Sequence, residues 1–289
     1  MRLRLPLALV MSLSVLAACT PPGSSPSASP EASSAEPGGS AFAAASASPS
    51  AEPVELTIFL AASLTGALEE VKTAYEADNP GTTLTLAPDS SSALRTQIEQ
   101  GAPADVYLSA DTTNPMTLVD AGLTEGDAVN FAGNELTVIV PTDNPAGIET
   151  PADLAGEGVI IIAAGEEVPI TKYAAVAVDN LAALPDYPAD FAAAYAANVA
   201  SREDNVKAVV TKIELGEGDA GIVYVTDAEA SDLVKAIEIP DDANVPATYA
   251  GVVVAASENI EAAMAFLAWF AGPDGQEILA GFGFLPPTQ

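Results

Sequence analysis

Stretches with the apolar spacing of strands and of helices alternate from residue 55 onward. Residues 55–61 form an apolar run that predicts a strand. The apolar positions from Leu64 to Tyr75 then follow the i, i+3, i+4, i+7 spacing of an amphipathic helix, which Asn79-Pro80-Gly81 ends. The alternation continues with a strand at 82–87, a short helix from 91 to 100 closed by Gly101, a strand at 105–109 and a helix from about Thr112. Strands that alternate with helices predict parallel pairing through crossover connections.

A second set of strands and helices follows from residue 136. Strands are expected at 136–140, 159–163 and 220–225, a helix from about Ile170 after a turn at 165–169, further strands near Ile237 and Val252, and a terminal helix at 260–270. We therefore expect an α/β protein of two lobes, each a mainly parallel sheet flanked by helices, with a ligand cleft between them. Lobe I would comprise residues 54–135 plus 237–289, and lobe II residues 136–236.

The first 53 residues do not have the composition of a folded domain. Two arginines precede an apolar run at residues 5–18, which is too short to span a bilayer and is typical of a signal peptide. The run ends in Leu16-Ala17-Ala18-Cys19, which resembles a bacterial lipobox. We predict that residues 1–18 are a lipoprotein signal peptide, that Cys19 carries the lipid, and that residues 19–53 form a disordered Ser/Ala/Pro tether. Such a protein would lie on the extracytoplasmic face of the cell membrane, held by its lipid anchor.

Composition removes several classes of chemistry. The chain has no histidine and a single cysteine, which excludes catalytic triads that use histidine, zinc fingers, His-ligated metal sites and structural disulfides. Its 9 basic and 40 acidic residues give a formal charge of -31, which argues against nucleic acid as a partner. No nucleophile, acid–base pair or cofactor loop stands in an expected place, so we expect neither a cofactor nor enzymatic activity.

Two of the expected strands are followed by a serine at the start of a helix. Ser63 comes shortly after the first strand, and the run Ser90-Ser91-Ser92 follows the second. A helix start presents unpaired N–H groups and the positive end of the helix dipole, so two of them facing one cleft can hold an oxyanion without a basic residue. Capping is the common role of an isolated serine, but one serine is enough for a cap and the run of three leaves hydroxyls to spare.

Four charged residues near these turns have structural explanations as well as functional ones. Asp105 and Asp111 invite comparison with the carboxylate pair of glycosidases, but their positions at a strand start and before a helix favour structural roles. Arg95 and Lys207 lie just inside two expected helix starts, where they either strengthen the local positive field or are solvated surface charges.

Several segments, agreeing in order and spacing over about residues 54–289, resemble the molybdate-binding proteins of ABC importers. They are AASLT at 61–65, SSSALRTQIEQGAPADVYLSAD at 90–111, GEEVPITKYA at 165–174, and EDNV followed eighteen residues after Val206 by Tyr224 in AGIVYVTDA. The resemblance implies the two-lobe fold of type II periplasmic binding proteins.

That family holds a tetrahedral molybdate or tungstate ion with serine hydroxyls, main-chain N–H groups at helix starts and a tyrosine hydroxyl. The resemblance assigns the contacts of the first lobe to the hydroxyls and amides of Ser63 and Ser91. It assigns those of the second lobe to the amides of Ile170 and Val206 and to the phenol of Tyr224. Ile170 departs from the family pattern, in which a smaller residue is common, and the spacing of Val206 alone favours a plain core position. Molybdenum would be present only inside the bound oxyanion.

We therefore expect a monomeric, lipid-anchored substrate-binding protein that delivers molybdate or tungstate to the permease of an ABC importer. Alternatives are a receptor for another oxyanion such as sulfate or phosphate, a surface lipoprotein without a transport role, and an enzyme such as a small-molecule transferase on the same fold. A site of neutral donors suits an ion that only accepts hydrogen bonds, whereas hydrogen phosphate would leave its own donor unpaired.

Overall fold

The computed structural model describes residues 53–287. The predicted signal peptide at 1–18, the lipidation at Cys19 and nearly all of the predicted tether lie outside the described residues. Over residues 53–287, no helix has both the length and the apolar character needed to cross a membrane.

Lobe I is built on a five-stranded sheet with the strand order β2-β1-β3-β10-β4. β1 pairs in parallel with β2 and β3, whereas β10 runs antiparallel to β3 and β4. Its elements, in chain order, are β1 (Val54–Ala61), the short 3-10 helix η1 (Ala62–Leu64), α1 (Thr65–Asp78), β2 (Thr82–Asp89), α2 (Ser91–Glu99), β3 (Val106–Ser109), α3 (Thr113–Asp120), β4 (Thr124–Asn134), β10 (Ala247–Val254), α8 (Ile260–Ala271) and α9 (Pro273–Gly281).

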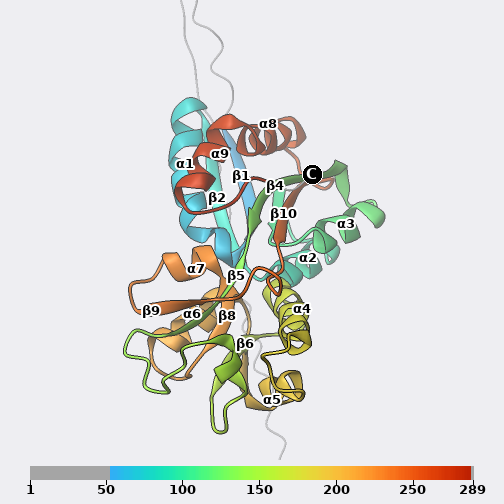
Figure 1. Ribbon diagram of the computed structural model, residues 1–289. Helices are drawn as coiled ribbons and strands as arrows, with labels where there is room; N and C mark the ends of the chain where they lie inside the picture. Colours follow the sequence, from blue (N-terminus) through green and yellow to red (C-terminus); the bar gives the residue numbers. More distant parts are fainter. Residues whose placement is uncertain (1–52, 288–289) are drawn as a thin grey trace, which may run out of the picture. The chain divides into compact units, whose positions relative to one another are not determined.

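Helices cover both faces of this sheet (Figure 1). Successive residues of a strand point to opposite faces, so Ile58 and Leu60 join the apolar cluster beneath α1 and α8 while Phe59 joins the cluster beneath α2 and α3. Gly101, with φ +87°, follows the end of α2, where a left-handed residue lets the chain leave the helix. The two clusters fix the positions of the helix starts at the carboxyl ends of β1 and β2.

Lobe II contains an antiparallel sheet of order β8-β5-β9 and a parallel pair β6-β7. A single parallel bridge joins Ile161 of this pair to Ala220, the residue directly before β8. It connects the pair to the antiparallel sheet. Its elements, in chain order, are β5 (Leu136–Pro141), η2 (Pro151–Ala155), β6 (Ile161–Ala164), α4 (Pro169–Ala183), α5 (Phe191–Asn198), β7 (Val199–Glu203), α6 (Val206–Glu214), β8 (Gly221–Tyr224), α7 (Val225–Glu229) and β9 (Val234–Glu238).

The chain crosses between the lobes twice. It leaves lobe I at the end of β4 and enters β5 with only Glu135 between them, and it returns between β9 and β10. β9 pairs with β5 through Glu238, so the lobe II sheet extends two residues past the boundary expected after residue 236. Apolar side chains of both lobes belong to one continuous buried cluster, which includes Phe131 of β4 and Leu136 of β5.

The expected α/β class with two lobes is confirmed, but the strand directions are mixed rather than mainly parallel. Parallel pairing holds for β2-β1-β3 and β6-β7. β5 and β10 are antiparallel to their neighbours because each enters its sheet from the other lobe. A strand that starts at the contact between the lobes runs away from it, whereas strands such as β1 and β8 end there.

Candidate binding site

Strand ends and helix starts of both lobes meet around one small cavity. Lobe I contributes the turns after β1 and β2, and lobe II contributes the starts of α4 and α6 and the end of β8. All five residues that the resemblance singled out line this cavity. The lining residues are Ala61, Ala62, Ser63, Ser90, Ser91, Ala110, Val168, Pro169, Ile170, Asn205, Val206 and Tyr224. None of them carries a charge.

Ser91 is the first residue of α2 but does not cap it. Ser90 is the capping residue, because its side chain accepts a hydrogen bond from the N–H of Ala93 at 3.3 Å. The Ser91 hydroxyl instead accepts from the N–H of Ala110 at 3.0 Å, and the Ser91 carbonyl accepts from the Tyr107 hydroxyl at 2.7 Å. With one serine capping, a second hydroxyl is left at the cavity wall, as the run of three predicted.

Ser63 lies in η1, directly after β1, and its side chain is not a cap either. Its hydroxyl oxygen is 3.0 Å from the hydroxyl oxygen of Tyr249 in β10, a residue 186 positions away in the chain. Both side chains are buried. The capping role that is common for an isolated serine is therefore wrong for Ser63.

The lobe II side of the cavity consists of two helix starts. Val206 is the first residue of α6, and Asn205 caps that helix by accepting from the N–H of Ala208 at 3.1 Å. Ile170 is the second residue of α4, after Pro169. N–H groups in the first turn of a helix have no acceptor within the helix, so they are available to a guest. The buried side chains of Val206 and Ile170 belong to the apolar core, so a core role for the side chain and a cavity role for the main chain coexist.

Tyr224 ends β8 and contributes a buried phenol to the cavity. Within residues 53–287 its hydroxyl has no hydrogen-bond partner, although the side chain is only 1% exposed. Burial raises the pKa of Tyr224 well above its usual value, so the phenol keeps its proton. A buried hydroxyl without a partner costs about 1–3 kcal/mol, which a guest that accepts its hydrogen bond would recover.

Arg95 and Lys207, the two cations just inside helix starts, both have protein partners. Arg95 donates to Asn114 at 2.9 Å and forms an ion pair with Glu99 on its own helix. Lys207 forms an ion pair with Asp227, with 3.1 Å between Nζ and Oδ1. Neither cation lines the cavity, so the positive field there comes from main-chain dipoles.

Asp105 and Asp111 have the structural roles that the sequence favours. The Asp105 carboxylate accepts from the N–H of Thr57 at 2.7 Å and so joins neighbouring strands. The Asp111 carboxylate accepts from the N–H of Asn114 at 3.0 Å at the start of α3. Neither residue lines the cavity. Residues 53–287 also contain no group of three or more His, Cys, Asp and Glu side chains suited to a metal ion.

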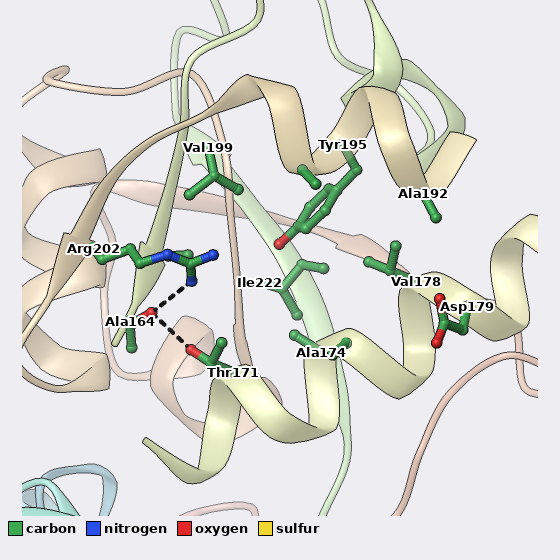
Figure 2. Close-up of a pocket in the computed structure, with 13 residues that line it drawn as sticks. Ala164, Thr171, Ala174, Val178, Asp179, Ala192, Tyr195, Val199, Arg202 and Ile222 are labelled. Atoms are coloured by element: carbon green, nitrogen blue, oxygen red, sulfur yellow. Dashed lines mark hydrogen bonds between the residues drawn. The ribbon is translucent and has the colours of Figure 1, made fainter. Parts of the chain in front are cut away.

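A second cavity of about 220 Å³ lies within lobe II, between α4, α5 and the strands behind them (Figure 2). Its lining includes six alanines, and two of its polar side chains share one acceptor. Thr171 and Arg202 both donate to the carbonyl oxygen of Ala164, at 2.9 and 3.3 Å, and Arg202 also pairs with Glu166. Small side chains that leave space explain this cavity.

Two α/β lobes around an uncharged cavity at helix starts define a protein that holds a small solute. The chain belongs to the family of bacterial extracellular solute-binding proteins, whose model matches residues 56–285. It is similar to the molybdate-binding protein ModA of Mycobacterium tuberculosis, with 33% identity over 233 residues, covering 80% of this chain and 85% of that protein. It is also similar to the putative ABC transporter substrate-binding lipoprotein YvgL of Bacillus subtilis, with 31% identity over 233 residues, covering 80% and 86%.

Among solved structures, the chain is similar to the substrate binding domain of a putative molybdenum ABC transporter from Clostridium difficile. The TM-score is 0.60 at 29% identity, covering 82% of this chain and 100% of that one. The resemblance that the motifs predicted is therefore confirmed.

Proposed function

We propose that this protein is the substrate-binding component of an ABC importer for molybdate or tungstate. The observation that carries the proposal is the buried, unpartnered hydroxyl of Tyr224 in a cavity where the starts of α2, α4 and α6 meet the hydroxyls of Ser63 and Ser91. The names of its relatives support the choice of ion and the pairing with a permease. On this proposal the protein has no catalytic residue and no cofactor, and it works as a monomer.

The chemistry of the cavity suits a fully deprotonated dianion. Serine and tyrosine hydroxyls and main-chain N–H groups donate hydrogen bonds, and such an ion only accepts them. The formal charge of -31 on the whole chain does not oppose this, because exposed charges more than about 8 Å away are screened at physiological ionic strength while the donors touch the guest.

The size of the cavity implies movement of the lobes. Its volume is about 10 Å³, close to what one water molecule needs and too small for a tetrahedral oxyanion. At its rim Asn205 of lobe II donates to Asp89 of lobe I at 3.5 Å, near the upper limit of a hydrogen bond. We expect the lobes to part there to admit the ion, and the spacing of the donors then selects the longer metal–oxygen bonds of molybdate over those of sulfate.

Molybdate should raise the melting temperature of the full-length protein in detergent. At a concentration 100 times Kd the expected stabilisation is about 2.7 kcal/mol, or about 5–10 °C for a domain of this size. Ser91→Ala should remove most of that shift, because it deletes a donor at the cavity. Ser92→Ala is the matched control, since the neighbouring serine does not line the cavity. Thermal melts recorded separately with molybdate, tungstate, sulfate and phosphate give the shift in melting temperature that each ion causes. A protein that no oxyanion stabilises contradicts the proposal, and a larger shift with sulfate than with molybdate contradicts the choice of ion.

We also propose that Cys19 carries the lipid that anchors the protein to the extracytoplasmic face of the membrane. The lipobox Leu16-Ala17-Ala18-Cys19 and the word lipoprotein in the name of the Bacillus subtilis relative support this. Expressed in a bacterium, the protein should partition into the detergent phase of a cloud-point extraction, and Cys19→Ser should move it to the aqueous phase. Wild-type protein in the aqueous phase would rule the anchor out.

A further inference from the structure

A chain of hydrogen bonds leads from the crossing between the lobes to Ser63. The Asn134 side chain, at the end of β4, accepts from the main-chain N–H of Glu135 at 3.0 Å through Oδ1. Its Nδ2 lies 2.8 Å from Oγ1 of Thr226 and 3.5 Å from the hydroxyl of Tyr249. The Tyr249 hydroxyl in turn lies 3.0 Å from the hydroxyl of Ser63.

The orientation of the Asn134 amide, together with the need of the buried Tyr249 hydrogen for an acceptor, gives each bond in this chain a direction. A main-chain N–H can only donate, so the oxygen of the Asn134 amide faces Glu135 and the NH₂ group faces the two hydroxyls. The Tyr249 oxygen therefore accepts from Asn134. The buried Tyr249 hydrogen needs an acceptor, and the Ser63 oxygen at 3.0 Å supplies one, so we assign Tyr249 as the donor of that bond. Ser63 accepts that hydrogen, which leaves the hydrogen of Ser63 free to point into the cavity. Burial raises the pKa of Tyr249 well above its usual value, so Tyr249 keeps the proton that it donates.

The hydroxyls of Ser91 and Tyr224, which line the cavity with Ser63, also have their hydrogens free for the guest. Ser91 accepts from the N–H of Ala110, another group that can only donate, so its hydrogen is also free for the guest. Tyr224 has no protein acceptor within the described part of the chain, and it would leave its hydrogen unpaired if it only accepted. The hydroxyls of Ser63, Ser91 and Tyr224 therefore face the cavity as donors.

We propose that Asn134 and Tyr249 are positioning residues that orient the Ser63 hydroxyl as a donor, and that they thereby select oxyanions without a proton over oxyanions that carry one. This inference rests on the proposed oxyanion site but not on which oxyanion fills it. Both side chains are almost completely buried, and the Tyr249 ring packs against Phe131, Tyr224 and Phe284. The contact between Asn134 and Tyr249 is long at 3.5 Å, so the packing of the ring is needed to hold the orientation together with the hydrogen bonds.

Sulfate and hydrogen phosphate are the matched pair that tests the inference. At mildly alkaline pH both are tetrahedral dianions of nearly the same size, and they differ in one proton. The ratio of their dissociation constants, measured by calorimetry on the full-length protein, cancels size and charge. The wild-type protein should bind sulfate about 10- to 100-fold more tightly than hydrogen phosphate, since a donor that faces a donor is left unpaired. Equal affinities in the wild type would overturn the inference without any variant.

Two substitutions test the orientation itself. Tyr249→Phe removes the donor to Ser63, so Ser63 can turn and accept from the guest, and the preference for sulfate should fall about tenfold. Asn134→Asp replaces the NH₂ group by an oxygen that accepts from Tyr249, which reverses the chain and turns Ser63 into an acceptor toward the cavity. Asn134→Asp should therefore also lower the preference for sulfate over hydrogen phosphate, by at least as much as Tyr249→Phe does. The added negative charge weakens the binding of both dianions alike, so it cancels in the ratio.

Tyr107→Phe is the matched control. Tyr107 is as deeply buried as Tyr249 and also donates to a serine of the site, but to the carbonyl oxygen of Ser91 rather than to its hydroxyl. Tyr107→Phe should lower the melting temperature and leave the ratio of the dissociation constants for sulfate and hydrogen phosphate unchanged. A ratio that stays the same in both Tyr249→Phe and Asn134→Asp, or that shifts equally in Tyr107→Phe, overturns the inference. A protein that binds sulfate but not molybdate would instead overturn the choice of ion and leave the orientation test valid.

Discussion

Val206→Pro should weaken molybdate binding by about 10- to 100-fold while the protein stays folded. On the proposed function, the N–H of Val206 is one of the donors to the ion, and proline is the one residue that deletes it. A hydrogen bond to a charged group contributes about 1.5–3 kcal/mol, which corresponds to this loss of affinity. Isothermal titration with molybdate measures it directly.

The backbone at the start of α6 can accommodate a proline at position 206. Val206 is the first residue of the helix, where proline is tolerated because its missing N–H has no acceptor within the helix. The residue before a proline must be extended, and Asn205 already is, with φ -155° and ψ 173°. The capping bond from the Ala208 N–H to Asn205 does not involve the Val206 amide.

Val206→Ala separates the main chain from the side chain. It keeps the amide and removes part of a buried side chain, so it should cost about 1–2 kcal/mol of stability and reduce affinity far less than Val206→Pro does. If the alanine variant loses as much affinity as the proline variant, the side chain shapes the pocket and the amide is not a donor. If neither loses affinity while both stay folded, the ion does not touch the start of α6.

The alternation of strands and helices in lobe I was predictable because each element has its own periodicity. The strand β4 was not predictable, because it is an edge strand whose first seven residues, from Thr124 to Asn130, are half-buried or exposed. Only pairing with β10 makes them a strand. α5 and β7 were missed for similar reasons: the alanine-rich α5 shows no apolar stripe, and β7 alternates without a fully buried residue. The antiparallel directions of β5 and β10 depend on the path of the chain between lobes, which local patterns do not record.

The cavity-lining residues were predictable only in part from the residues themselves. Ser63 and Ser91 follow strand ends, and Asn205 before an apolar helix is a recognisable cap that marks the start at Val206. A contact through a main-chain amide leaves no mark on the side chain, so Ile170 and Val206 came from the resemblance. Tyr249 lies inside an apolar strand, and its bond to Ser63 joins residues 186 positions apart, beyond the reach of any local signal.

Lys207→Met should lower the free energy of unfolding by about 3 kcal/mol at neutral pH. The Asp227 side chain is completely buried behind the site, and Lys207 is the cation that pairs with it, at 3.1 Å. Removing one partner of a buried ion pair leaves an uncompensated charge and costs about 3–5 kcal/mol. We expect the lower end of that range because the Lys207 side chain is 36% exposed. Urea unfolding of both proteins gives the difference.

The penalty in Lys207→Met should shrink as the pH falls, and this dependence identifies its cause. Burial raises the pKa of Asp227 and the nearby ammonium of Lys207 partly opposes the rise, so without the ammonium the pKa rises further. A carboxyl whose pKa is higher in the folded state than in the unfolded state binds more protons when folded, so its contribution to stability increases as the pH drops from the folded pKa toward the unfolded value of about 3.9. Asp227→Asn removes the charge altogether, so adding Lys207→Met to that variant should cost less than about 1 kcal/mol. A penalty that is the same at every pH, or that persists in the Asp227→Asn background, would mean that Lys207 stabilises α6 by packing rather than by neutralising Asp227.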